Sequence, residues 1–116
     1  MKKLIVIDDD PLVLQAYSAA VSVLGHECQT FDCWKEAEPV ITSQRPDAVF
    51  TDLNLGDDTG FDVLERIRLL FGPESPKVIA VSGESTDATQ VADGGFDNYL
   101  RKPYSLTDLA KLLDDL

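Results

Sequence analysis

Short apolar runs alternate with longer segments of helical spacing along the whole chain. Five runs are rich in apolar or β-branched residues, too short for a helix and bounded by turn-forming residues, a pattern typical of strands buried in a sheet. The predicted strands cover residues 4–7, about 27–31, 47–52, 77–82 and 98–101. The third strand ends at a carboxylate, Asp52, which a turn follows.

The segments between these runs carry apolar residues three or four positions apart, the spacing of one helix face. They predict helices over residues 11–24, about 32–44, 61–71, a short stretch within 83–95, and 105–116. Asp10 is placed to cap the first helix, with Pro11 at its first position. Pro39 lies well inside the second helix, where proline removes a hydrogen bond, so we expect that helix to be bent or shortened. The fourth helix has few apolar residues and is expected to be short and weakly anchored.

Repeated alternation of strand and helix predicts one α/β domain over residues 1–116. Buried parallel strands with right-handed crossovers place helices on both faces, which gives a doubly wound, five-stranded parallel sheet. Trp34 is expected at the surface. The last helix is expected to turn four leucines inward: Leu106, Leu109, Leu113 and Leu116.

Charge and composition narrow the function. The chain has 10 Lys+Arg against 21 Asp+Glu, a net charge of −11, which opposes contact with nucleic acid or an anionic membrane. It suits a metal cation or a basic partner surface. No apolar stretch is long enough for a membrane span or a signal peptide, so a cytoplasmic location is expected. Cys28, Cys33 and His26 make a poor metal set and are interpreted as ordinary side chains.

Polar side chains stand at the carboxyl ends of four predicted strands. Asp8 and Asp9 follow the first strand, Asp52 the third, Ser82 the fourth and Lys102 the fifth. All these ends lie on one edge of a parallel sheet. If the first and third strands are neighbours, three carboxylates meet, and like charges so placed require a cation. Oxygen ligands favour Mg²⁺, which commonly binds one or two carboxylates together with a phosphate. Lys102 suits a phosphoryl oxygen.

Four motifs at these strand ends resemble the response regulator receiver domain, the phosphoacceptor module of two-component signalling. They are Ile7 to Pro11, Asp52 with Gly60 eight residues later, Val81-Ser82-Gly83, and Tyr99 to Tyr104. The resemblance spans the whole chain. It implies a flavodoxin-like sheet of strand order 2-1-3-4-5.

The resemblance also implies the chemistry. Asp52 is the expected phosphoacceptor, which attacks the phosphohistidine of a sensor histidine kinase or a histidine phosphotransfer protein. Lys102 and Ser82 would bind phosphoryl oxygens. Such a protein is a switch and not an enzyme in the usual sense, because it assists only its own phosphorylation and dephosphorylation.

The same resemblance gives the metal ligands. Asp9, Asp52 and the backbone carbonyl of Asn54 would bind Mg²⁺ directly, and Asp8 would hold a metal-bound water. Asn54 and Glu84 resemble variable positions beside the phosphorylation site, which tune the access of water.

A phosphoryl group on Asp52 would draw Ser82 inward, and Tyr99, which resembles the family's switch aromatic, would turn from exposed to buried. The face made by the fourth helix, fifth strand and fifth helix would then be read by a downstream protein. The expected state is a monomer or a weak, phosphorylation-dependent dimer. A Tyr at an edge strand needs no switching role, however, and Ser82 could be a plain turn residue.

The chain departs from the family pattern in several places. Gly56 stands where proline is usual, which is expected to loosen the loop. Ser82 and Lys102 are 20 residues apart, about two fewer than is typical of the family, so the fourth helix is expected to be shortened. Phe96 replaces a small residue and is expected to fill the space beside it.

Two other functions remain open at this point. The chain could be a receiver-like interaction module that is never phosphorylated, although the complete set of site residues opposes this. It could also be a Mg²⁺-dependent phosphohydrolase with Asp52 as nucleophile. Such enzymes typically need a second acid/base carboxylate and a cap, for which 116 residues leave no room.

Overall fold

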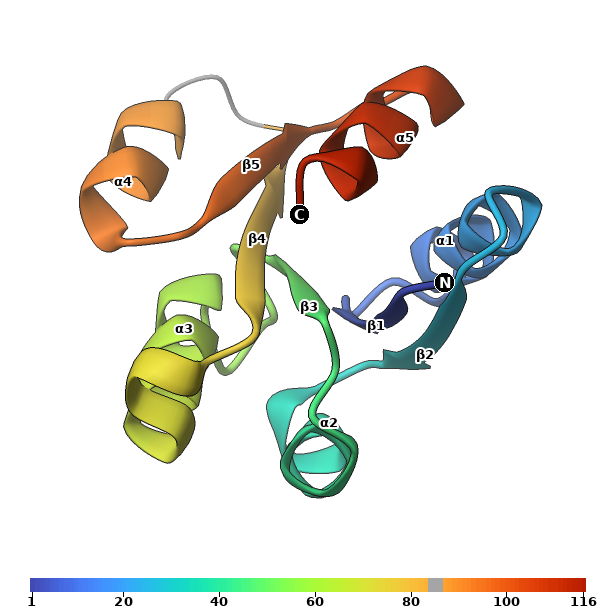
Figure 1. Cartoon of the computed structure of the whole chain (residues 1–116). Helices are drawn as coiled ribbons and strands as arrows, with labels where there is room; N and C mark the ends of the chain where they lie inside the picture. Colours follow the sequence, from blue (N-terminus) through green and yellow to red (C-terminus); the bar gives the residue numbers. More distant parts are fainter. Residues whose placement is uncertain (84–86) are drawn as a thin grey trace.

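A single five-stranded parallel sheet runs through the centre of the protein (Figure 1). The computed structural model describes residues 1–83 and 87–116. The strand order is β2-β1-β3-β4-β5, as the family resemblance implies. The strands are β1 (Lys3–Ile7), β2 (Glu27–Phe31), β3 (Ala48–Asp52), β4 (Lys77–Ser82) and β5 (Asn98–Arg101).

Helices cover both faces of the sheet. They are α1 (Pro11–Val23), α2 (Trp34–Gln44), α3 (Gly60–Phe71), α4 (Asp87–Gly94) and α5 (Leu106–Asp114), with a 3₁₀ turn, η1, at Gly72–Glu74. Figure 1 shows α1 and α5 on one side and α2, α3 and α4 on the other. None of the helices that the structure describes is long and apolar enough to cross a membrane.

The two faces of the sheet each bury one apolar core. Leu4 and Val6 of β1 point into the core under α1 and α5. Ile5 and Ile7 point the other way, into the core under α2 and α3. Because successive side chains of a strand alternate between the two faces, both sets must be apolar. This explains why the central strands are continuous apolar runs.

Side-chain caps fix the start of three helices. Asp10 accepts a hydrogen bond from the Leu12 N–H at 2.9 Å at the start of α1, as predicted. Ser105 starts α5, and its hydroxyl and the Asp108 carboxylate exchange hydrogen bonds with each other's backbone N–H groups. Thr59 caps α3 in the same way. These caps satisfy N–H groups that have no partner within the helix.

Two side-chain predictions are wrong. Trp34 is only 7% exposed and belongs to the core under α2 and α3, because it begins α2 on its inward face. The guanidinium of Arg66 lies over its ring, 5.9 Å from the centroid. In α5, Leu106 is 45% exposed while Leu112 is buried. The inward stripe of α5 is therefore shifted by part of a turn toward Leu112.

The helix α2 continues across Pro39. It begins at Trp34, two residues later than expected, and ends at Gln44 as one continuous element. Arg45 follows in the left-handed conformation, with φ at 48°. Pro39 therefore does not end the helix, and the predicted bend stays a prediction.

The helix α4 has eight residues, so the prediction of a short fourth helix is confirmed. Its C-terminal end rests on α3. A Cβ atom at Gly94 would lie 2.7 Å from a ring carbon of Phe61, so a larger residue there would require the Phe61 ring to shift. Phe96 packs edge-on against the same Phe61 ring, with centroids 5.3 Å apart. Phe96 thus fills the space beside α4, as expected.

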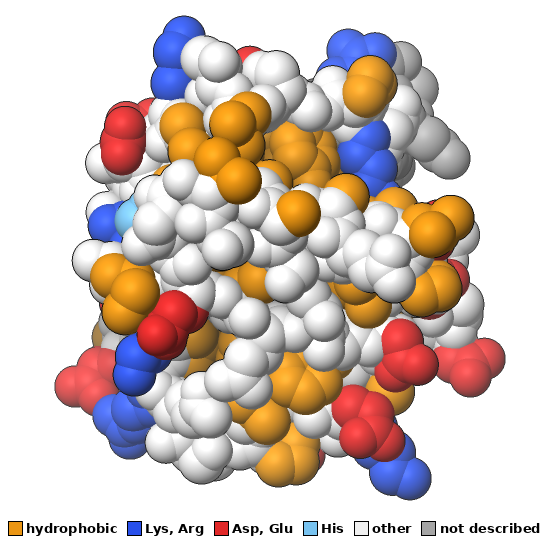
Figure 2. All heavy atoms as spheres, turned by 90° about the vertical axis from the view of Figure 1, so that its right-hand side faces the viewer, with side chains coloured by type: hydrophobic (Ala, Val, Ile, Leu, Met, Phe, Trp, Pro, Cys, Tyr) orange, Lys and Arg blue, Asp and Glu red, His pale blue; other side chains and the backbone are white. Residues whose placement is uncertain are grey.

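The outer face of α1 carries no charge. The helix contains no acidic or basic residue, and Leu12 and Val23 are each 72% exposed. Figure 2 views the side of the molecule on which α1 and α5 lie, where hydrophobic side chains spread over much of the surface. An apolar groove runs between α1 and the segment that leads into α5. It is lined by Val13, Ala16, Ala20, Lys102, Pro103, Tyr104 and Leu106.

Candidate functional site

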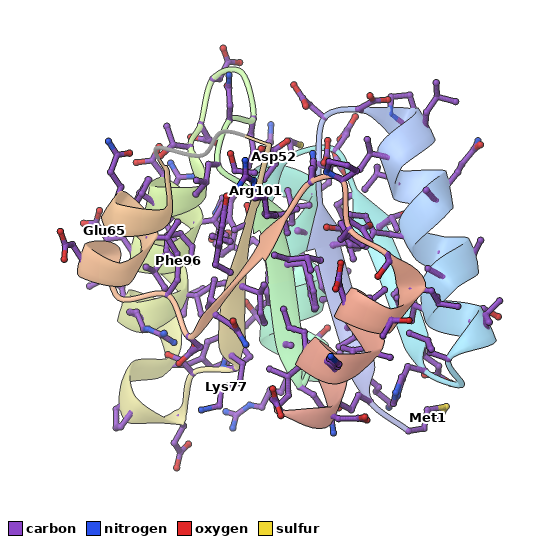
Figure 3. The ribbon with its side chains drawn as sticks, turned by 90° about the horizontal axis from the view of Figure 1, so that it is seen from above. Met1, Asp52, Glu65, Lys77, Phe96 and Arg101 are labelled. Carbon is purple, nitrogen blue, oxygen red and sulfur yellow. The ribbon has the colours of Figure 1, made fainter. Side chains whose placement is uncertain are left out.

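Strand register brings the predicted site residues to one edge of the sheet. Ile7 of β1 pairs with Thr51 of β3, so the residues that follow them, Asp8 and Asp52, leave the sheet side by side. Asp52 also pairs with Val81 of β4. Figure 3 shows Asp52 and Arg101 at this edge, and Met1 and Lys77 at the opposite one.

Three carboxylates meet there. One oxygen from each of Asp8, Asp9 and Asp52 lies within 4.8 Å of the others. Asp8 is only 2% exposed, whereas Asp9 is exposed and Asp52 half-buried. Burial raises the pKa of the Asp8 carboxyl above its ordinary value, although hydrogen bonds from the Asp10 N–H and the Lys102 ammonium act against this. The folded chain therefore holds a negative charge where burial disfavours it.

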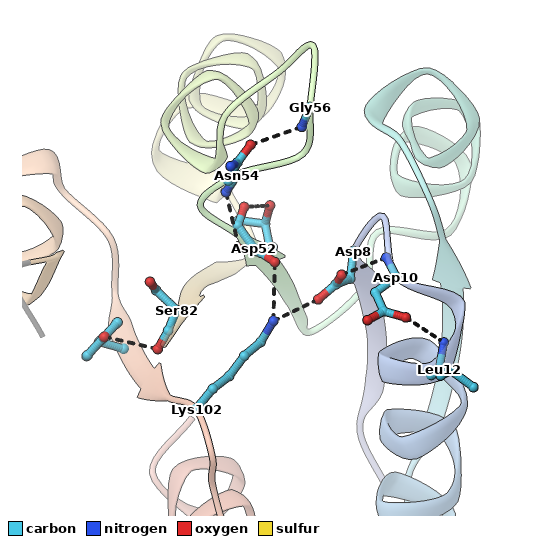
Figure 4. Close-up of polar contacts among 10 residues, drawn as sticks. Asp8, Asp10, Leu12, Asp52, Asn54, Gly56, Ser82 and Lys102 are labelled. Atoms are coloured by element: carbon cyan, nitrogen blue, oxygen red, sulfur yellow. Dashed lines mark hydrogen bonds and ion pairs between the residues drawn. The ribbon is translucent and has the colours of Figure 1, made fainter. Parts of the chain in front are cut away.

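Lys102 ties two of these carboxylates together (Figure 4). Its Nζ lies 3.1 Å from Asp8 Oδ2 and 3.2 Å from Asp52 Oδ2. Burial lowers the pKa of Lys102, but the attraction of Asp52 and Asp8 outweighs it and the net pKa is raised. Lys102 is therefore a fixed positive charge at neutral pH. The backbone helps to place it there, because the Lys102 N–H donates to the Ser82 carbonyl at 2.9 Å.

The donor set fits a hard divalent cation. Within the described residues, Lys102 is the one side-chain cation within ion-pair distance of these carboxylates, so three negative charges face one positive charge. All the available ligand atoms are oxygens, which suits Mg²⁺. A second positive charge would offset the remaining repulsion. The sequence-based prediction that Asp8, Asp9 and Asp52 come together is therefore met by the geometry.

The nucleophile candidate is held on both of its oxygens. Asp52 Oδ1 accepts the Asn54 N–H at 3.1 Å, and Oδ2 faces Lys102. The start of α3 lies close behind it, since a Cβ at Gly60 would be 2.8 Å from the Asp52 carbonyl oxygen. Glycine at position 60 thus allows the loop to return against the strand.

Gly56 does not leave the loop unanchored. Its N–H donates to Asn54 Oδ1 at 3.1 Å, and the next residue back, Leu55, is buried in the core. Asp58 accepts the Leu55 N–H at its carbonyl and pairs with Arg66 through its carboxylate. Hydrogen bonds and burial therefore fasten this segment at several points.

Ser82 and Tyr99 occupy the other side of the site. Ser82 ends β4 and is 6% exposed. The Tyr99 hydroxyl donates to the Ser82 carbonyl at 3.2 Å, and the side chain is half-buried. An open hollow of about 500 Å³ lies above the site, and its lining includes Asp52, Ser82, Lys102, Phe61 and Gln90.

Two features were missed by sequence reasoning. Phe61 lines the hollow and also supports α4, which its helical spacing alone does not reveal. Tyr17 lies buried in the core beside Tyr104, with ring centroids 5.3 Å apart. Its hydroxyl makes no hydrogen bond of ordinary geometry in the part of the chain that the structure describes, although it interacts with the Tyr104 hydroxyl. Burial raises the pKa of Tyr17 well above its ordinary value.

Glu84, which the sequence predicts beside the phosphorylation site, lies outside the described residues.

Sheet order and site together define a class: a flavodoxin-like α/β protein whose polar site lies at the carboxyl ends of its parallel strands. Comparison with known proteins defines the family. A family model described as the response regulator receiver domain matches residues 4–114, and the chain belongs to this family.

Curated relatives agree. The chain is 35% identical over 115 residues to the transcriptional regulatory protein KdpE of Mycobacterium tuberculosis, an alignment that covers 97% of this chain and 50% of that protein. It is 33% identical over 107 residues to the transcriptional regulatory protein PmrA of Pectobacterium parmentieri, with coverages of 92% and 48%. The chain thus spans about half the length of the curated relatives it matches.

Solved structures share the fold. A CheY-like response regulator receiver domain from Methylobacillus flagellatus is 27% identical with a TM-score of 0.89, covering 99% of this chain and 98% of that one. The receiver domain of a sensor histidine kinase from Pseudomonas aeruginosa is 22% identical with a TM-score of 0.87, covering 98% and 95%. That structure was solved with a magnesium ion coordinated in its active-site cleft.

Proposed function

We propose that this receiver domain, residues 1–116, is a phosphoacceptor switch in which Asp52 takes a phosphoryl group from a phosphohistidine in a Mg²⁺-dependent reaction. The observation that carries the proposal is the Lys102 ammonium, which lies within 3.2 Å of Asp52 inside a group of three carboxylates. If Asp52 only ended a strand, the fold would not need two further carboxylates and a lysine beside it.

The chain's own residues fit the roles that such a transfer requires. An oxygen of the Asp52 carboxylate forms the new P–O bond as the P–N bond to the partner's imidazole breaks, and the imidazole keeps the electron pair. Asp9, Asp52 and the Asn54 carbonyl would hold Mg²⁺, with Asp8 on a metal-bound water. The bound metal supplies positive charge to the phosphoryl oxygens. Lys102 then turns its charge from the carboxylate to a phosphoryl oxygen, and the Ser82 hydroxyl donates to another.

The switch follows from the same side chains. Movement of Ser82 toward the phosphoryl group would change the contacts that Tyr99 makes at the end of β4. Phosphorylation would thereby favour one of two arrangements of the face made by α4, β5 and α5. A downstream protein would read that face. We propose a monomer, or a weak dimer formed on phosphorylation.

The phosphodonor would be a histidine kinase or a histidine phosphotransfer protein in the cytoplasm. The uncharged face of α1 lies beside the site and supports a protein donor, since an apolar helix face can pack there without pairing charges. The net charge of −11 argues against nucleic-acid binding by this domain itself. It would assist its own phosphorylation and would not turn over external substrates.

The test uses a small phosphodonor. The protein is incubated with Mg²⁺ and acetyl phosphate and its intact mass is measured. We expect one phosphoryl adduct that requires the metal, is absent from Asp52→Ala, and remains in Asp57→Ala. The Asp57 variant is a matched control, because it removes an exposed carboxylate from the same loop.

Other outcomes would replace the proposal. Absence of an adduct with every donor, including a phosphorylated histidine protein, would favour the interaction module that is never phosphorylated. Rapid hydrolysis of many phosphoesters would favour the phosphohydrolase. An adduct that persists in Asp52→Ala would move the acceptor to another residue.

A further inference from the structure

Two consecutive turns connect Gly56 to the Asp52 carboxylate. The Gly56 N–H donates to Asn54 Oδ1 at 3.1 Å, and the Asn54 N–H donates to Asp52 Oδ1, also at 3.1 Å. The peptide before Asn54 is therefore linked to Asp52, and the side chain of Asn54 is held by the peptide before Gly56. Figure 4 shows this chain of contacts above Lys102.

Gly56 is suited to its place for two reasons. Its φ is +84°, a conformation that glycine adopts without penalty and other residues rarely adopt. A Cβ atom there would meet nothing within 4 Å. Glycine is therefore favoured by the backbone conformation and not by a lack of room for a side chain. Proline, which the family resemblance predicts at this position, has a fixed negative φ and no N–H to donate.

The remainder of the loop is fixed by other contacts. Leu55 is 8% exposed and packs in the core. The Leu55 N–H donates to the Asp58 carbonyl at 2.9 Å, and the Gly60 N–H donates to the Leu53 carbonyl at 3.0 Å. These two bonds restrain the peptides on either side of Asn54, and the bond from the Gly56 N–H to the Asn54 side chain adds a third restraint. Loss of the Asn54 side chain would therefore loosen the chain between residues 54 and 56 without releasing the loop as a whole.

We propose that Gly56 and the Asn54 side chain are a positioning pair for the metal and the nucleophile. Together with the backbone bonds of the loop they refine the orientation of the Asn54 main chain, so that its N–H holds Asp52 Oδ1 while its carbonyl is available to the cation. The proposal deepens the proposed function and rests on it. Neither the Gly56 N–H nor the Asn54 carboxamide is required to touch the phosphoryl group.

The experiment compares five proteins: the wild type, Asn54→Ala, Gly56→Ala, the double variant of these two, and Gly25→Ala. Gly25 is the matched control, since its φ is +83° and a Cβ there also meets nothing within 4 Å. Both glycine variants thus carry the same backbone strain, but Gly25 lies in the turn before β2. Mg²⁺ affinity is measured by calorimetric titration, and hydrogen exchange at residue 56 by NMR.

We expect Asn54→Ala to weaken Mg²⁺ binding by about tenfold, the scale found for residues that orient metal ligands. Gly56→Ala should weaken it in the same direction, and the double variant no more than the stronger single variant, because both changes break one turn. Gly25→Ala should match Gly56→Ala in lost thermal stability but keep wild-type affinity. Protection of the residue 56 amide should be lost in Asn54→Ala and retained in Asn54→Asp, which keeps the acceptor.

Mg²⁺ affinity within twofold of the wild type in both single variants would overturn the positioning pair, as would equal weakening by Gly25→Ala. Additive effects in the double variant would also overturn it. Failure of the wild type itself to bind Mg²⁺ or accept a phosphoryl group would instead overturn the proposed function. The two failures are therefore distinguishable.

Discussion

On the β1–β3 side of the site, two of the three carboxylates are held from more than one direction. Asp8 is buried between the Asp10 N–H and Lys102, and Asp52 between the Asn54 N–H and Lys102. On the β4–α4–β5 side, the described part of the eight-residue α4 is held by apolar contacts. Val91 is its buried anchor among the described side chains, and Gly94 touches Phe61.

The difference suits a switch. Chemistry requires fixed atoms, whereas a signal requires a segment that can change at low cost, and such segments come from the least anchored parts of a fold. Arg68 limits this freedom at one end of α4. Its guanidinium binds the Gly95 carbonyl at 3.2 Å and the Asp97 carboxylate at 2.9 Å. The C-terminal end of α4 and the start of β5 are therefore tied to α3.

Lys102 joins the two sides, because it follows β5 and reaches the carboxylates of β1 and β3. We expect Lys102→Ala to reduce the rate of Asp52 phosphorylation by about 100-fold, as loss of one preorganised donor does. Mg²⁺ affinity should be retained, because the carboxylates remain and lose a competing cation. Rates come from intact mass at saturating Mg²⁺. Lys111→Ala, an exposed lysine on α5, is the control, and a normal rate in Lys102→Ala would contradict the role.

A substitution at Asp8 tests whether the carboxylates on the β1–β3 side of the site lower the stability of the fold while they serve metal binding. Without metal, Asp8→Asn should raise the free energy of unfolding by on the order of 1 kcal/mol, because it removes a buried charge of raised pKa. It should also weaken Mg²⁺ binding at least tenfold, which lowers the stabilisation by excess metal by about 1.4 kcal/mol.

The pH dependence of this effect has a definite sign. A raised pKa means that the folded state binds the Asp8 proton more tightly than the unfolded state, so ionisation of Asp8 costs stability as pH rises through that pKa. The gain from Asp8→Asn should therefore be largest at neutral pH and shrink as the pH is lowered. Urea unfolding at several pH values measures it. A variant less stable than the wild type at neutral pH would show that the pairing with Lys102 dominates.

Phe96 tests the weaker side. We expect Phe96→Ala to lower the free energy of unfolding by about 2 kcal/mol, since a half-buried ring and its contact with Phe61 are lost. Hydrogen exchange should become faster in α4 and the start of β5. Mg²⁺ affinity should stay unchanged, and Leu69→Ala on the exposed face of α3 should alter neither. A fall in metal affinity would break the distinction between the two sides.

Tyr17 gives the smallest expected effect. Its buried hydroxyl makes no hydrogen bond of ordinary geometry in the described part of the chain, although it interacts with the Tyr104 hydroxyl. Tyr17→Phe should therefore raise the free energy of unfolding by about 0.5 kcal/mol. The phosphorylation rate should be unchanged. Thermal unfolding measures the gain, and a loss of stability would show that the hydroxyl is satisfied in solution, for instance by an internal water.

Periodicity predicts the elements well where one pattern is strong, as in β1, β3 and β4. It fails where an element carries two patterns. In α5, leucines at positions 106, 109, 112, 113 and 116 permit more than one inward face, and packing chose Leu112 over Leu106. The sequence predicts Trp34 at the surface, since a lone aromatic beside charged residues carries no periodic signal. Its burial follows from where α2 begins.

The sequence by itself determined that Asp8, Asp9, Asp52, Ser82 and Lys102 stand at strand ends, because strand boundaries follow from local composition. Local composition does not say which ends are neighbours: the family resemblance implies the strand order, and the tertiary structure shows it. The pairing of β1 with β3 and of β4 with β5 sets the 3.1 and 3.2 Å contacts of Lys102. The tertiary structure also shows that the Gly56 N–H binds the Asn54 side chain. That hydrogen bond depends on the positive φ of Gly56, which the residue pattern does not report. Contacts between residues far apart in the chain are selected by how the elements pack, and the local residue pattern does not report that packing.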